Sequence, residues 1–129
     1  MEDMGIEGGF WKGKRVLITG HTGFKGSWLA LWLSHLGARV AGYALEPPTE
    51  PSHYRLLELD AESVQGDIRD LERLERCLKG NRPDIIFHLA AQAIVRRSYD
   101  DPVETFETNV LGTVNVLQAA RTSDTVRAV

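Results

Sequence analysis

Three glycines, Gly20, Gly23 and Gly26, constrain the fold of this chain more than any other feature. They follow residues 14–19, a short apolar run rich in β-branched residues that predicts a strand. They precede residues 27–36, which are apolar nearly all round and predict a helix. Gly20 would permit the tight turn out of the strand, Gly23 would let a ligand approach the backbone, and Gly26 would let the helix pack on the sheet. The helix N-terminus would then offer free N–H groups to a pyrophosphate.

The alternative is a glycine-rich turn that only connects two elements, and the position between a strand and a helix argues against it. No Gly-Lys-Ser or Gly-Lys-Thr follows the loop, which excludes a phosphate-binding loop of the nucleoside-triphosphatase type. The loop therefore predicts a dinucleotide site.

The rest of the chain alternates strands and helices. Further strands are expected at residues 39–44, 63–66, 84–89 and 126–129, with helices at 54–59, 71–79 and from 102 to about 121. A proline-rich loop is expected at residues 46–52. Such alternation predicts an α/β fold, a Rossmann-type doubly wound parallel sheet that breaks off at the start of strand five.

Composition removes several classes of protein. Length (129 residues) suggests one domain, and the longest apolar run, residues 28–33, is too short to span a membrane. No leader opens the chain and Cys77 is the only cysteine, so we expect a cytoplasmic protein without disulfides or a cysteine metal site. Glu2, Asp3 and Glu7 account for the whole net charge of −3, leaving no basic surface for nucleic acid. Residues 1–9 are expected to be a flexible tail, and residues 10–129 the domain.

The end of the second predicted strand bears on the choice between NAD and NADP. A carboxylate is expected there to hold the adenosine ribose, but the apolar pattern places Ala44 at that position and Glu46 two residues later. The next arginine is Arg55, so nothing close in sequence indicates a clamp for a 2′-phosphate. The sequence favours NAD.

Two further turns could contact a cofactor. Asp67 could accept a hydrogen bond from an adenine amino group with Ile68 covering the ring, or Asp67 could serve the turn while Asp70 caps the next helix. Small residues at Ala90 and Ala91, beside Gln92, would let a cofactor lie against the carboxyl edge of the sheet, or they could simply pack under a helix. His88 lies in an apolar strand and is interpreted as a core histidine rather than a catalytic base.

The sequence does not decide the roles of several polar residues in the last third of the chain. Arg96, Arg97, Ser98 and Tyr99 could face a phosphorylated substrate or form a solvated patch. Asn109 and Asn115 lie on different faces of the long helix, and a structural hydrogen bond to strand backbone would satisfy a buried Asn109. Residues at helical spacing are expected on the buried side of this helix: Phe106, Val110, Thr113, Val114 and Leu117. Cys77 is expected to be inert.

Several stretches resemble the extended short-chain dehydrogenase/reductase family of nucleotide-sugar enzymes, namely residues 19–28, 42–45, 66–70, 88–92, 97–102 and 108–113. The resemblance covers residues 10–129 and implies NAD as cofactor. It implies that the glycine loop, including Thr22 with Phe24 and Lys25, contacts the pyrophosphate and that Asp67 and Ile68 contact adenine. It further implies that Ala90, Ala91 and Gln92 line the nicotinamide-ribose side and that Thr108 lies near the cofactor. The residues 21–28 are similar to those of members that act on a CDP-sugar.

Such enzymes oxidise the sugar at C4, eliminate water across C5 and C6, and return the hydride to C6. Their catalytic Tyr-x-x-x-Lys has no counterpart here, because Tyr43, Tyr54 and Tyr99 lack a lysine four residues later. The resemblance thus implies the cofactor half of an enzyme that is a homo-oligomer at full length, inactive as this chain alone and without catalytic residues of its own. Alternatives are another nucleotide-sugar dehydratase or epimerase, or a non-catalytic dinucleotide-binding module.

Overall fold

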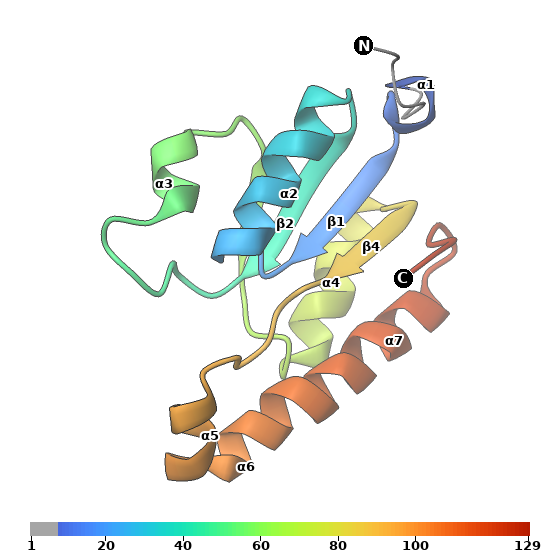
Figure 1. Cartoon of the computed structure of the whole chain (residues 1–129). Helices are drawn as coiled ribbons and strands as arrows, with labels where there is room; N and C mark the ends of the chain where they lie inside the picture. The colour runs from blue at the N-terminus through green and yellow to red at the C-terminus, as the bar shows by residue number, and fades with distance from the viewer. Residues whose placement is uncertain (1–7) are drawn as a thin grey trace.

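The computed structural model describes residues 8–129 and contains one sheet of parallel strands (Figure 1). Its strands are β1 (Arg15–Thr19), β2 (Arg39–Ala44), β3 (Glu62–Gln65) and β4 (Ile85–His88), in the spatial order β3-β2-β1-β4. This is the predicted Rossmann-like α/β architecture. Near the end of the chain, Ala128 forms an isolated parallel bridge with Ile85. The strand expected at residues 126–129 is therefore represented by one bridge beside β4.

Helices cover both faces of the sheet. The chain order gives α1 (Gly8–Trp11), α2 (Phe24–His35), α3 (His53–Leu57), α4 (Leu71–Asn81), α5 (Val95–Asp100), α6 (Pro102–Phe106), the π-helical turn η1 (Glu107–Leu111) and α7 (Gly112–Thr122). One face packs against α4 and α7, with Leu17, Leu74 and Val116 in its core. The other face packs against α2, with Ile18 and Leu33 in its core. Of the tail predicted for residues 1–9, residues 1–7 lie outside the described part, and Gly8 and Gly9 begin α1.

Local signals place most helix ends as the sequence predicts. Asp70 caps α4, because its side chain accepts a hydrogen bond from Arg73 N at 3.0 Å. Pro102 occupies the first turn of α6, and Gly37 ends the α2 region with a φ of +87°. Helix α2 begins at Phe24, three residues before the predicted start, and α5 lies in a segment for which the sequence predicts no element.

The buried side predicted for the long helix is wrong for four of its five residues, and only Thr113, which is partly buried and bonded to His88, faces the sheet. Phe106, Val110, Val114 and Leu117 are all at least half exposed, whereas the buried residues of α7 are Gly112, Val116 and Ala119. Small residues make this contact because Ile68 presses directly on Gly112, where an added Cβ would overlap its side chain. The helix therefore packs inward through Gly112, Val116 and Ala119, and its larger apolar side chains remain exposed.

Candidate functional site

The carboxyl ends of the four strands meet at one edge of the sheet. Thr19 of β1 is in register with Tyr43 of β2 and with His88 of β4, and Ala44 pairs with Gln65 of β3. A cleft of about 380 Å³ opens at this edge. Of the predicted site residues, those that line it are Gly20, Thr22, Gly23, Asp67, Ile68, Ala90, Ala91, Gln92 and Thr108. Open α/β sheets bind ligands at this position.

The glycine loop lies directly against the end of β4. Gly20 has a φ of +78°, and a Cβ built there would lie 2.7 Å from Ala90 N. A Cβ at Gly26 would overlap the Gly20 carbonyl oxygen. The loop therefore brings bare backbone into the cleft and against the start of α2, as the spacing predicts.

Three predicted residues lie outside the cleft lining. Gly26 is buried in the contact between helix and loop, whereas Lys25 and Phe24 are exposed and the Phe24 ring packs against His53 with centroids 5.6 Å apart. Phe24 and Lys25 form the first turn of α2, whose N-cap Gly23 makes no side-chain capping bond. Their backbone N–H groups are among those that a helix leaves unpaired at its start.

A chain of hydrogen bonds joins the end of β1 to the long helix. Thr19 Oγ1 accepts from Leu89 N at 3.1 Å and Ala90 N at 3.2 Å, so its own proton is directed at His88 Nδ1, 2.7 Å away. His88 Nε2 then carries the ring proton and donates to Thr113 Oγ1 at 3.0 Å, and Thr113 donates to Asn109 O at 2.7 Å. Burial lowers the pKa of His88. His88 is thus a neutral histidine with both ring nitrogens bonded; it is partly buried and not a core residue, and its hydrogen bonds are those of a structural histidine.

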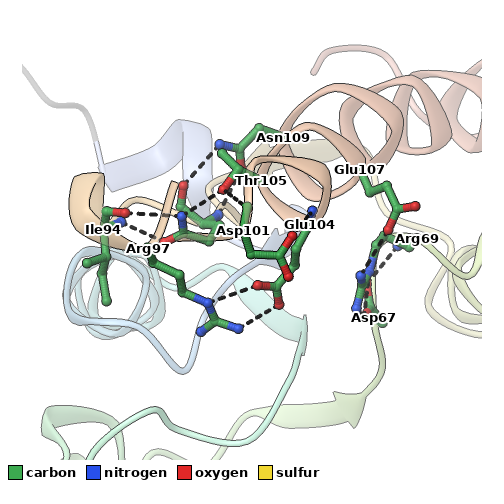
Figure 2. Close-up of polar contacts among 10 residues, drawn as sticks. Asp67, Arg69, Ile94, Arg97, Asp101, Glu104, Thr105, Glu107 and Asn109 are labelled. Atoms are coloured by element: carbon green, nitrogen blue, oxygen red, sulfur yellow. Dashed lines mark hydrogen bonds and ion pairs between the residues drawn. The ribbon is translucent and has the colours of Figure 1, made fainter. Parts of the chain in front are cut away.

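Asn109 clamps the last part of the cleft wall (Figure 2). Its Oδ1 accepts from Gln92 N at 2.8 Å and its Nδ2 donates to Gln92 O at 3.0 Å. The Gln92 side chain in turn donates to Thr105 Oγ1 and to Ile94 O. Asn109 lies in η1, and π-helical turns frequently occur at functional sites. Asn109 thus forms a structural hydrogen bond to backbone, but to the loop after β4 rather than to a strand, and Asn115 donates similarly to Ile68 O.

Asp67 and its neighbours form the wall after β3. Asp67 accepts from Arg69 N at 2.9 Å and forms an ion pair with the Arg69 guanidinium at 2.7 Å, and these hydrogen bonds lower the pKa of Asp67. Arg69 also reaches Glu107 in η1 at 3.4 Å (Figure 2). Asp67 therefore serves the turn, as one interpretation of the sequence proposed, while still lining the cleft. Ile68 is buried, and its side chain contacts Gly112.

Charged residues outside the predicted cofactor set also line the cleft, among them Arg97, which the sequence left open between a substrate contact and a solvated patch. Arg97 lines it and is held by Glu104 through two hydrogen bonds, at 2.9 and 2.6 Å (Figure 2). Arg69 and Glu104 line it as well, and so does Glu46, the displaced acid after β2. The Asp-Ile-Arg-Asp turn after β3 is a sequence signal for Arg69. Glu104 depends on how α5 folds back onto α6, which no local pattern indicates.

His21, the second residue of the glycine loop, is buried behind it. Its Nε2 is hydrogen-bonded to Ser63 Oγ at 2.7 Å, its ring meets Tyr54 edge-on, and its Nδ1 has no hydrogen-bond partner within residues 8–129. Burial lowers the pKa of His21 to about 4. His21 is therefore neutral at pH 7 and anchors the loop to β3.

Two classes of site find no support in residues 8–129. None of the helices in this range is long and apolar enough to cross a membrane. The same range contains no group of histidine, cysteine, aspartate and glutamate residues arranged to hold a metal ion.

Solved structures of similar architecture include nucleotide-sugar enzymes with bound NAD. The Thermus thermophilus UDP-glucose 4-epimerase in complex with NAD matches with a TM-score of 0.77 and 35% identity, over 88% of this chain and 36% of that one. The epimerase Mth375 of Methanothermobacter thermautotrophicus matches with a TM-score of 0.81 and 36% identity, over 91% of this chain and 34% of that one.

Sequence comparison identifies relatives of the same kind. CDP-glucose 4,6-dehydratase of Salmonella typhimurium is 52% identical over 126 residues, which cover 96% of this chain and 35% of that enzyme. CDP-paratose 2-epimerase of Salmonella typhi is 36% identical over 110 residues, 83% of this chain and 32% of that enzyme. The chain thus spans about a third of the length of these relatives. The family model for GDP-mannose 4,6-dehydratase matches residues 17–129, and the chain belongs to this family of nucleotide-sugar dehydratases and epimerases.

Proposed function

We propose that this chain is the NAD-binding part of a dehydratase that converts CDP-glucose to CDP-4-keto-6-deoxy-glucose. The observation that carries the proposal is the meeting of the bare glycine loop with the Ala90 backbone at the carboxyl edge of the sheet. The 52% identity to a CDP-glucose 4,6-dehydratase supports the choice of substrate.

The residues present fit a dinucleotide. Because Gly20 has no side chain, the loop packs directly on the Ala90 backbone, and the cleft beside this contact is lined by both residues. Gly20, Thr22 and Gly23, with the N–H groups at the start of α2, would hold the pyrophosphate. Asp67 and Ile68 would contact adenine, and Ala90, Ala91, Gln92 and Thr108 would line the nicotinamide-ribose side.

NAD, when bound, supplies a hydride acceptor and donor, so that oxidation at C4, loss of water and return of the hydride to C6 amount to dehydration without net redox change. This chain would contribute by orienting the cofactor and by excluding water from it. The bonds from Asn109 to Gln92 and from Thr19 to Ala90 fix the wall against which the nicotinamide end would lie. We propose that proton transfer at the sugar is carried out by residues beyond position 129, because no tyrosine here is followed by lysine at the fourth position.

Calorimetric titration of the 129-residue chain with NAD tests the cofactor site. We expect saturable binding that Gly23→Val abolishes, because a Cβ at Gly23 would already lie 3.3 Å from Gly20 O and the branched side chain would fill the approach to the loop. Gly80→Ala is the control, since a Cβ at Gly80 meets nothing within 4 Å. Absence of NAD binding by a chain that is folded by circular dichroism would refute the cofactor assignment.

Substrate choice is tested in a longer protein that contains this sequence. We expect CDP-glucose, rather than GDP-mannose, to lose one molecule of water when it is incubated with the enzyme and NAD, as followed by mass spectrometry. Turnover of GDP-mannose in preference would contradict the assignment to CDP-glucose.

A further inference from the structure

Arg55 of α3 folds back to the end of β2 and joins two glutamates of the preceding loop. Its Nη2 lies 3.3 Å from Glu46 Oε2, and its Nη1 lies 2.6 Å from Glu50 Oε2. Glu46 lines the cleft, whereas Arg55 and Glu50 lie outside its lining. The sequence suggested no arginine near this corner, because Arg55 is nine residues from Glu46 along the chain. The fold brings it there.

This corner lies where a dinucleotide-binding sheet discriminates between its two cofactors. At the end of the second strand, a carboxylate favours the free ribose hydroxyl of NAD, and an arginine favours the 2′-phosphate of NADP. Here a carboxylate and an arginine are both present. The corner is tied to the glycine loop, because Thr22 Oγ1 donates to Leu45 O at 2.9 Å.

We propose that Glu46 and Glu50 mask Arg55, so that this corner selects NAD while containing a latent site for the 2′-phosphate of NADP. The inference rests on the proposed dinucleotide site and adds the residues that set cofactor choice. Arg55 contributes one positive charge against two negative ones, so the three side chains together carry a charge of −1. A 2′-phosphate would have to displace Glu46 before it could reach the guanidinium.

The two arginines that line the cleft cannot take over this role without breaking ion pairs of their own. Arg69 is bound by Asp67 and Glu107, and Arg97 is bound by Glu104. Among residues 8–129, every arginine that lines the cleft is thus already matched by a carboxylate. Discrimination between NAD and NADP therefore depends on the strength of these ion pairs. The exposed Glu46–Arg55 pair is the one that lies at the end of β2.

The ion pairs of Arg55 with Glu46 and Glu50 can be removed without unfolding the protein. The side chains of Glu46, Glu50 and Arg55 are each more than half exposed, and exposed ion pairs contribute little to stability. Substitutions here should leave the protein folded, which makes cofactor affinity a direct readout.

The test is a set of calorimetric titrations with NAD and with NADP. We expect the wild-type chain to prefer NAD, and Glu46→Gln to lower the ratio of the NADP to the NAD dissociation constant about tenfold, or about 1.4 kcal/mol. In an Arg55→Met background the same Glu46→Gln change should shift the ratio by less than about threefold, because no guanidinium is left to unmask. Glu72→Gln, which removes a similar exposed glutamate paired with Arg76 on α4, should leave the ratio unchanged.

Each alternative result has a distinct meaning. A ratio unchanged in Glu46→Gln, or an equal shift with and without Arg55, overturns the masking by Arg55 while leaving the dinucleotide site intact. A wild-type chain that prefers NADP overturns it as well. A folded wild-type chain that binds neither cofactor refutes the proposed function, and with it the inference.

Discussion

Replacing Thr19 by valine removes one fully buried hydroxyl and nearly preserves the shape of the side chain. That hydroxyl accepts from Leu89 N and Ala90 N and donates to His88 Nδ1. Leu89 N retains a bond to Thr19 O at 3.1 Å, so two groups are left without partners, the Ala90 N–H and His88 Nδ1. Each unsatisfied buried group costs about 1–3 kcal/mol, and burying a methyl group instead of a hydroxyl offsets part of this. We expect Thr19→Val to lower the free energy of unfolding by about 2–4 kcal/mol.

Urea unfolding followed by circular dichroism measures this loss, with the slope against denaturant checked for constancy. Thr19→Ser keeps the hydroxyl and should cost only the buried methyl, about 1 kcal/mol. Thr122→Val is the matched control: Thr122 is exposed and bonds only to carbonyls of its own helix, so a change within about 0.5 kcal/mol is expected. If Thr19→Val lost less than about 0.5 kcal/mol, the reasoning from unsatisfied groups would be refuted.

Three further predictions address burial and charge. The pKa of His21 is about 4 in the folded chain and near 6.5 when unfolded, so its contribution is complete above pH 6.5 and is lost as the pH falls towards 4. Unfolding free energies should drop between about pH 6.5 and 4.5 by up to about 3 kcal/mol, and less steeply in His21→Asn; equal slopes would contradict this origin. Gly42→Ala should cost more than about 3 kcal/mol in urea unfolding, because the added Cβ would overlap the His21 ring, and a loss below about 1 kcal/mol would show that the ring can move. Val116→Ala should destabilise by about 2 kcal/mol while the half-exposed Val114→Ala changes little by the same measurement, and the reverse order would show that the helix presents its other face to the sheet.

The strands, the glycine loop and most helix ends were predictable because their signals are local. A β-branched apolar run before Gly20 predicts a strand and a turn, and Asp70 and Pro102 mark helix starts through their own backbone chemistry. The cleft followed from the same logic, since parallel strands bring their carboxyl ends to one edge.

Periodicity could not identify the buried face of the long helix. It shows that Phe106, Val110 and Val114 share a face, but it does not show which face meets the sheet. Packing against distant residues decides that: Gly112 lies against Ile68 of the loop after β3, and Val116 lies in the core with Leu17. The ion pair between Arg55 and Glu46 could not be predicted from the sequence either, because it depends on how the loop after β2 and α3 fold together.

Because of the strand order, the cleft can form only late in synthesis, after β4 has been made. The first strand made, β1, occupies the interior of the sheet, and the His88 that bonds to its Thr19 is 69 residues further along the chain. At about 5–20 residues per second, a ribosome needs roughly 3–14 s to add that length. For that interval one edge of β1 has unpaired N–H and C=O groups, and the glycine loop lacks the Ala90 backbone against which it packs in the folded chain.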